Sequence, residues 1–181
     1  MSLGMHIPSG RPQEGEYAAY AQADIDYVEG DDAVAALEAQ LQATLALFSP
    51  VDEELASTFV YAPGKWTLKQ VVGHLADDER IFAYRALCIA RNDSRPLPGF
   101  DEKAYVRFAG FEAREWTDLL AEYRAVREST LVFFRTFTPE VWLRRGIVNG
   151  YEASVRGLAF HIVGHELHHL RIVRDKYLRL P

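Results

Sequence analysis

The stretch Trp66–Arg91, WTLKQVVGHLADDERIFAYRALCIAR, decides the fold. Thr67 precedes Gln70 by three positions, a spacing that predicts a capping box at the start of a helix. Apolar side chains then recur every three or four residues, which places them on one side of that helix. This stripe is made of Leu68, Val71, Val72, Leu75, Phe82 and Ile89. A helix of this length with one apolar side predicts packing against other long helices.

Three further segments show the same helical period. The first begins near Asp31 and ends before Pro50. The second covers roughly residues 115–136, and the third, residues 155–178, follows the capping residue Ser154. Almost no segment alternates apolar and polar residues with the period of a strand. We therefore expect an all-α protein in which these helices form a four-helix bundle.

Shorter segments connect the expected helices. Residues 1–30 carry few periodic signals and predict an N-terminal arm with a short helix, ahead of a bundle domain over residues 31–181. The turn-rich segment NDSRPLPGFDE, residues 92–102, predicts a long crossover loop, a type of connection that often carries function. Residues 103–109 suit a short helix, and Gly146 with the Asn-Gly pair at residues 149–150 predicts a loop or a tight turn.

Composition limits the class of protein and its partners. The 181 residues suffice for one sizeable core, and nearly half of them are apolar. A net charge of −6 without a dense basic patch argues against nucleic acid as a partner. No apolar run is long enough to cross a membrane, and no N-terminal apolar stretch predicts secretion. A single cysteine, Cys88, cannot form an internal disulfide, so we expect a cytoplasmic protein with Cys88 as a buried apolar residue.

The segment FHIVGHELHH, residues 160–169, holds four of the six histidines. On a helix, His165 and His169 lie one turn apart on one face, the spacing at which two imidazoles reach one metal ion. His161 continues that row one turn earlier, whereas His168 lies about 60° away from it. A metal site in a bundle needs at least one more ligand from a facing helix.

The letters HELHH also match the H-E-x-x-H pattern of zinc proteases, in which Glu166 would be the general base. Such a protease needs a third ligand after a turn that contains glycine, but this position is Ile172 and the helix continues past it. A di-iron bundle needs two Glu-x-x-His pairs, and the chain offers one, Glu166 with His169. These departures argue against a protease and exclude a di-iron site.

His74 is the internal histidine that can supply the third ligand. It lies within the apolar stripe of its helix, where a lone histidine is commonly a satisfied core residue. Facing the pair on the last helix, it completes three imidazoles with an open fourth position, as in catalytic zinc sites. We expect zinc, with nickel as the alternative divalent ion, because both accept imidazole. His6, in the arm, has no expected role.

The motifs GKWT (64–67), VVGHLAD (71–77) and H-x-x-x-H (165–169) occur in an order and spacing that resemble the DinB superfamily. The closer likeness is to its YfiT-like branch, which is described as a group of metal-dependent hydrolases. The segment PLPGFDEKAY, residues 96–105, is similar to the crossover of that branch. The resemblance covers roughly residues 60–176.

This resemblance implies a four-helix bundle in which His74, His165 and His169 bind a divalent metal. His161 would then be a pocket residue or an alternate ligand. Several members of the superfamily are S-transferases that use thiols such as bacillithiol or mycothiol, and others are thiol-dependent isomerases. The chain departs from many members just after the ligands, where residues 170–172 read LRI, so the resemblance leaves the substrate open.

The function expected first is a metal-dependent transferase that presents a small-molecule thiol, as thiolate, to an electrophile. A hydrolase is the first alternative; it would act on a hydrolysable substrate and need a base, for which Glu166 and Asp78 are the candidates. Asp78, four residues after His74, could instead orient that imidazole. Both acids also suit a solvated, charged surface, as the run DDER at residues 77–80 indicates, and the sequence favours this interpretation.

A non-enzymatic role is the second alternative, in which a metal-binding or stress-response bundle carries a structural or vestigial site. Helical bundles of this size often pair through exposed apolar faces, so a homodimer is one expected assembly. Trp66 and Tyr105 would either line the pocket or belong to the core, and the sequence favours the core.

Overall fold

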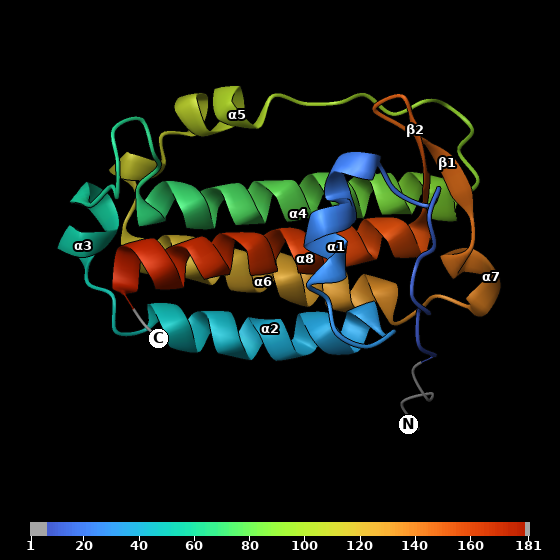
Figure 1. Cartoon of the computed structure of the whole chain (residues 1–181), viewed down its shortest axis with the longest axis horizontal. Coiled ribbons are helices and arrows are strands. Elements are labelled where there is room, and N and C mark those ends of the chain that lie inside the picture. The colour runs from blue at the N-terminus through green and yellow to red at the C-terminus, as the bar shows by residue number, and fades with distance from the viewer. Residues whose placement is uncertain (1–6, 180–181) are drawn as a thin grey trace.

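The computed structural model describes residues 7–179, and within this part of the chain four long helices form a bundle (Figure 1). These helices are α2 (Ala33–Phe48), α4 (Leu68–Ala90), α6 (Trp116–Phe134) and α8 (Val155–Ile172). The predicted all-α four-helix bundle is confirmed. His6 and the first residues of the predicted arm lie outside the described residues.

Side-chain caps begin three of the four long helices, α2, α4 and α8. The Thr67 hydroxyl accepts a hydrogen bond from the backbone N–H of Gln70, and the Gln70 side chain accepts one from the N–H of Thr67, so the capping box is formed. Asp32 and Ser154 cap α2 and α8 by accepting from backbone N–H groups of the first turn. These caps satisfy donors that a helix leaves unpaired at its start.

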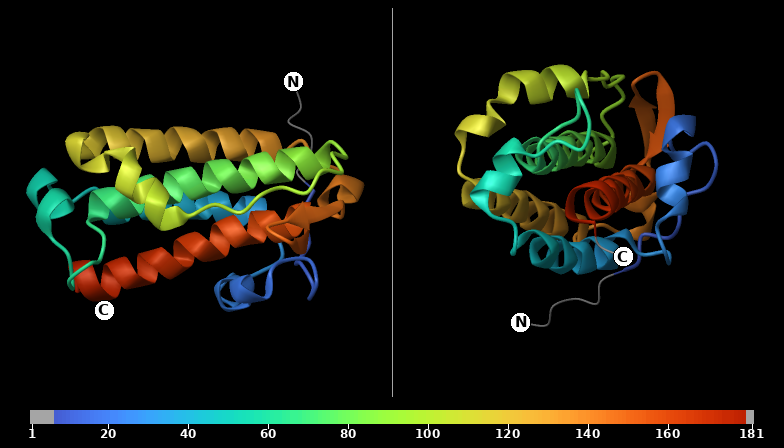
Figure 2. Two further views of the ribbon diagram at one scale, coloured as in Figure 1. Left: turned by 90° about the horizontal axis from the view of Figure 1, so that it is seen from above. Right: turned by 60° about the vertical axis from the view of Figure 1, so that its left-hand side comes forward.

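The order of the helices around the bundle differs from a simple up-and-down arrangement. α4 packs against α6 and α8, and α2 packs against the same two helices, so α2 and α4 lie on a diagonal. Figures 1 and 2 show α4 and α6 running in the same direction. The chain must therefore return along the whole bundle between them. This return is the reason for the long crossover that the sequence predicts.

A β-hairpin follows α6 and the short helix α7 (Pro139–Trp142). Its strands, β1 (Arg145–Val148) and β2 (Tyr151–Ser154), are antiparallel. Asn149 and Gly150 form the turn with φ of 51° and 81°, a left-handed conformation that asparagine and glycine tolerate. Of the loop or tight turn predicted here, the structure has the tight turn. The strands on either side have four residues each, which is too short for an alternation of apolar and polar residues to reveal them.

The crossover runs from α4 to α6 through α5 (Glu102–Ala109) and a 3-10 turn, η2 (Phe111–Ala113). It is joined to the hairpin: Leu97 donates a hydrogen bond to Ile147 O at 2.9 Å, and its carbonyl accepts one from Asn149 N at 2.8 Å. This pairing ties the crossover loop to the end of the bundle where α8 begins.

Residues 7–30 pack against α8 rather than extending from the bundle. The 3-10 turn η1 (Ala19–Ala21) and the helix α1 (Gln22–Asp26) lie across α8 (Figures 1 and 2). Gly164 makes this close approach possible, because a Cβ at that position would overlap the backbone oxygen of Asp24. The N-terminal segment therefore contributes to the core of the described protein.

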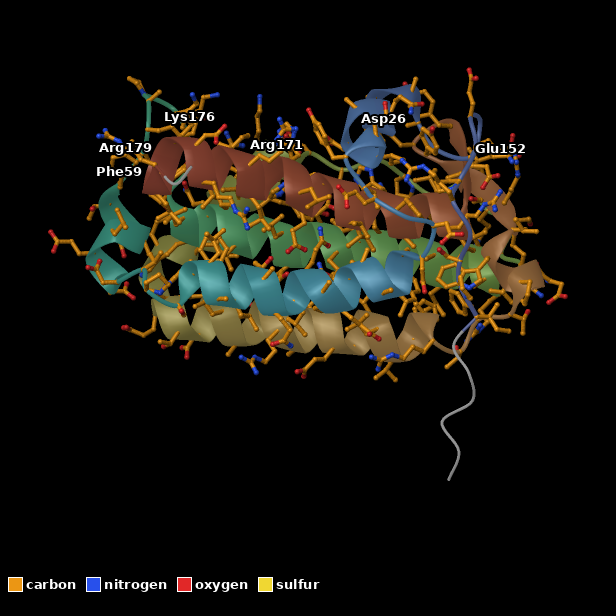
Figure 3. All side chains as sticks on the ribbon, turned by 60° about the horizontal axis from the view of Figure 1, so that its bottom comes forward. Asp26, Phe59, Glu152, Arg171, Lys176 and Arg179 are labelled. Carbon is orange, nitrogen blue, oxygen red and sulfur yellow. The ribbon has the colours of Figure 1, made fainter. Side chains whose placement is uncertain are left out.

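The remaining elements close the ends of the bundle. α3 (Glu53–Thr58) connects α2 to α4, and α8 changes into a π-helical turn, Val173–Leu178, which ends where the sequence predicts. Figure 3 shows side chains filling the space between the helices, with Arg171 and Lys176 pointing outward. Cys88 is buried, as predicted. Within residues 7–179, no helix is both long and apolar enough to cross a membrane.

Candidate metal centre

α4 and α8 bring the three predicted ligands together. His74 lies on α4, and His165 and His169 face it from successive turns of α8. The Nε2 atoms of His74 and His169 each lie 3.1 Å from Nε2 of His165. The three ligand atoms all lie within 4.8 Å of one another. The structure therefore contains the cluster that the sequence predicts.

The spacing of these atoms fits one metal ion. Zinc–nitrogen bonds of about 2.0–2.1 Å in a tetrahedron place neighbouring nitrogens about 3.3 Å apart, close to the distances found here. Three ring nitrogens that present lone pairs to one another repel, and a cation between them turns this repulsion into attraction. Three imidazoles also leave one tetrahedral position open for a further ligand.

Asp78 lies behind His165 and orients it. Its Oδ2 is 3.2 Å from His165 Nδ1, and only 4% of its surface is exposed. A proton on Nδ1, shared with this carboxyl group, leaves the lone pair of the ring on Nε2, the atom that faces the other histidines. The expectation that Asp78 could orient His74 is wrong, because the packing of α4 on α8 places Asp78 opposite His165.

Burial keeps the clustered histidines neutral, which is the form that binds metals. It lowers the pKa of His74 to about 4 and that of His169 to about 3. The pKa of His165 is held well below its usual value by burial, with its neighbouring histidines adding to the effect. Burial also raises the pKa of Asp78 well above the usual range of a carboxyl group. A cation at Nε2 favours the charged form of Asp78, because opposite charge offsets the loss of hydration.

His161 lies one turn before His165 and belongs to the wall beside the cluster. Its ring stacks on Phe82, with ring centres 3.8 Å apart, and its Nε2 lies 3.9 Å from Asp78 Oδ2. Burial lowers the pKa of His161 to about 3. His161 is expected to be either a pocket residue or an alternate ligand, and its place in this wall favours a pocket residue.

Trp66 covers another side of the cluster. Its ring centre lies 4.8 Å from that of His74 and 6.2 Å from that of His169. The Tyr177 hydroxyl donates a hydrogen bond to the Trp66 carbonyl, which ties the end of the π-helical turn to this position. Tyr105, in contrast, is 49% exposed on α5, so its interpretation as a core residue is wrong.

A cavity of about 400 Å³ opens beside the histidines. His165, His169 and Asp78 contribute to its wall, as does His161. Residues without a predicted role in the site complete the wall, among them Tyr20, Asp24, Phe82, Arg85, Phe100 and Asn149. They come from the N-terminal segment, α4, the crossover and the hairpin, which only the topology of the bundle brings together. Local patterns place Phe82 in the apolar stripe and Asn149 in a turn, but none of them assigns these residues to the site.

Glu166 lies outside this cavity, in the core of the bundle. It is about 100° around the helix from His165, so it points toward α2 and α6 instead. Its carboxylate accepts a hydrogen bond from the Tyr123 hydroxyl at 2.6 Å and forms an ion pair with Arg127. The structure does not bring this carboxylate to the histidines. Glu166 and Asp78 are 2% and 4% exposed, so the interpretation of both as solvated surface acids is wrong.

Comparison with known proteins identifies the family of this chain. The profile of the DinB superfamily matches residues 36–173, a range that contains all three clustered histidines. The chain belongs to the DinB superfamily. No curated protein matches it.

The fold of this DinB superfamily member is similar to that of YfiT from Bacillus subtilis, described as a probable metal-dependent hydrolase with an unusual four-helix bundle topology. The two chains are 19% identical with a TM-score of 0.67, and the match covers 99% of this chain and 98% of YfiT. At this identity the likeness shows the fold alone. Together with the family profile, it confirms the resemblance drawn from the motifs.

Proposed function

We propose that this protein is a metal-dependent enzyme that transfers a low-molecular-weight thiol to a small electrophilic substrate. The observation that carries the proposal is the convergence of three imidazole Nε2 atoms beside a cavity of about 400 Å³. A divalent metal held by His74, His165 and His169, zinc first and nickel as the alternative, would supply a Lewis acid with an open coordination position. A cavity of this volume suits a small molecule.

The carboxyl groups around the cluster favour thiol transfer. A thiol has a pKa of about 8.5 and ionises readily when a positive charge is near, so it needs no strong base from the protein. Hydrolysis, in contrast, needs a base that removes a proton from water. Among the described residues, Asp78 is the carboxyl group in contact with a clustered histidine, and it is already engaged with His165. Glu166 is held by Arg127 in the core.

Hydrolysis is the second candidate, and the likeness to YfiT favours it, because that protein is described as a probable metal-dependent hydrolase. In this reaction Asp78 is the residue that would accept the proton, because among the carboxyl groups that line the cavity it is the one in contact with His165. Glu166 would keep its place in the core and take no part in proton transfer.

The metal content of the purified full-length protein tests the site. We expect close to one equivalent of zinc or nickel in the wild type, and loss of the metal in His74→Ala and in His165→Ala. His168→Ala is the matched control, because His168 lies on the same helix, half exposed, outside the cluster. Full retention of metal in His74→Ala or His165→Ala would contradict a three-histidine site.

Activity is tested by incubating the metal-loaded protein with candidate thiols and a chromogenic electrophile. Thiol transfer predicts an acceleration that depends on the metal and disappears in His74→Ala. Acceleration of ester or amide hydrolysis without a thiol would instead support the hydrolase. Metal binding without either activity would support the non-enzymatic alternative.

A further inference from the structure

Arg85 is a buried cation in the wall of the same cavity. It lies on α4, about two turns past Asp78, and its surface is 3% exposed. Within residues 7–179 its guanidinium donates a single hydrogen bond, from Nη2 to Pro98 O at 2.7 Å, and it has no carboxylate within ion-pair distance. A guanidinium has five N–H donors. The other donors of Arg85 therefore have no acceptor in the described part of the chain.

Aromatic rings hold this guanidinium in place. Its Cζ lies 4.7 Å from the ring centre of Phe82 and 5.6 Å from that of Phe100. Phe100 and Pro98 belong to the crossover, which the hairpin fixes through Leu97. The contacts therefore orient the charge but do not neutralise it.

The carboxyl groups that share the cavity are engaged elsewhere or lie at its edge. Asp78 contacts His165, and Asp24 Oδ1 lies 3.2 Å from His168 Nδ1. Glu102 is exposed at the start of α5. Burial lowers the pKa of Arg85, but a guanidinium remains charged at neutral pH. A buried charge without a partner is costly, so an external anion would be favoured at this position.

We propose that Arg85 binds an anionic oxygen group of the substrate, a carboxylate or a phosphate. The planar fork of its N–H donors matches two oxygens of such a group. Arg85 follows Asp78 by about two turns of α4, and both side chains line the cavity together with the clustered histidine His165, which Asp78 contacts. The substrate would therefore carry both an anionic group that reaches Arg85 and a reacting group that reaches the histidine cluster, within this one cavity. Only the assignment of the reacting end rests on the proposed function.

The test is a titration of the metal-free, full-length protein with inorganic phosphate and with succinate, followed by the NMR signals of the arginine side-chain N–H groups. Succinamide, which has the same skeleton without charge, is the ligand control. We expect saturable binding of both anions that is weakened roughly 10- to 100-fold in Arg85→Gln and partly restored in Arg85→Lys. Arg80→Gln is the protein control, because Arg80 lies on the same helix and pairs with Asp77 and Glu122 instead.

Equal anion affinity in the wild type and a folded Arg85→Gln would overturn the proposal, and so would the absence of saturable binding to the wild type. Circular dichroism establishes that the variants are folded, and Arg85→Lys provides a variant that keeps the charge. Because no metal is present, the result is independent of the histidine cluster. Anion binding without metal binding would leave this inference standing and contradict the proposed function.

Discussion

At the scale of single residues, His165 is the most constrained member of the histidine cluster. Its Nε2 faces both His74 and His169 at 3.1 Å, and its Nδ1 faces Asp78 at 3.2 Å. Its ring also stacks against that of His161, with centres 5.6 Å apart. Because both nitrogens of the His165 ring are engaged, the ring has one orientation in which its Nε2 can bind a metal. Asp78 therefore influences a bound metal through His165 rather than by direct contact.

Replacing Asp78 with asparagine tests this indirect role. The amide of Asp78→Asn can still accept a hydrogen bond, but it lacks the negative charge that raises the basicity of His165. We expect metal affinity to fall about 10- to 100-fold. Competition with a chelator measures the affinity. Asp77→Asn, one position earlier and paired with Arg80, is the control and should bind metal as the wild type does. Unchanged affinity in Asp78→Asn would argue against the orienting contact.

At the scale of elements, a buried charged cluster joins the four long helices. Arg127 on α6 pairs with Glu79 on α4 at 2.9 Å and with Glu166 on α8. Its Nη1 also donates a hydrogen bond to the carbonyl of Leu37 on α2 at 3.1 Å. One guanidinium thus contacts the three other long helices, including α8 on the opposite side of the bundle. The acidic residue of the H-E-x-x-H pattern belongs to this structural cluster and not to the cavity.

The charged cluster predicts a ranked series of stabilities. Arg127→Met leaves Glu79 and Glu166 buried without a cation, so we expect a loss of about 3–5 kcal/mol in the free energy of unfolding. Glu166→Gln keeps the pair of Arg127 with Glu79 and should cost less. Urea unfolding measures both values. Glu166→Gln should also retain the full metal content. Loss of metal from this variant would mean that Glu166 contributes to the metal site.

The crossing of α1 over α8 is the second feature at this scale. It depends on Gly164, which has no side chain to separate the two elements. Tyr20 and Asp24, which line the cavity, come from the same N-terminal segment. A change at Gly164 should therefore affect the cavity wall although the residue itself does not line it.

Gly164→Ala should displace α1 from α8. Alanine is the better helix former by roughly 0.5–1 kcal/mol, but overlap with a backbone oxygen costs about 1–3 kcal/mol, so we expect net destabilisation. Amide hydrogen exchange should become faster over residues 19–28 while α4 and α6 keep their protection. A variant with higher stability and unchanged exchange would show that the crossing can accommodate a methyl group.

At the scale of the whole molecule, the features that the sequence predicts correctly are those that depend on the spacing of residues within one helix. Thr67 with Gln70 marks a helix start, and His165 with His169 marks a ligand pair, because both depend on one helical turn. The parallel direction of α4 and α6 depends on the packing of all four helices, which no short motif encodes. Arg85 therefore escapes prediction, because its place in the cavity depends on where the crossover returns. Asp78 is assigned to the wrong histidine for the same reason.

The histidines also determine how stability responds to pH. In an unfolded chain a histidine has a pKa of about 6.5, whereas burial lowers the pKa of His161 to about 3 in the folded, metal-free protein. Between these values the unfolded state binds a proton that the folded state does not. The contribution is therefore fully present above about pH 6.5 and is lost as the pH falls toward 3, by about 1.4 kcal/mol per pH unit. His74 and His169, with pKa values lowered to about 4 and about 3, add losses of the same sign.

His161→Gln isolates this effect, because glutamine is polar and does not titrate. The free energy of unfolding, measured with urea in the presence of a chelator, should depend less steeply on pH in the variant, by about 1.4 kcal/mol per unit between about pH 6 and 4. The absolute stability of His161→Gln can fall because the stacking on Phe82 changes, but this shifts the curve without altering its slope. Parallel curves for the wild type and the variant would contradict this prediction. They would mean that His161 is protonated to the same extent in the folded and unfolded states. The buried contact between its ring and Phe82 would then have to open at mildly acidic pH.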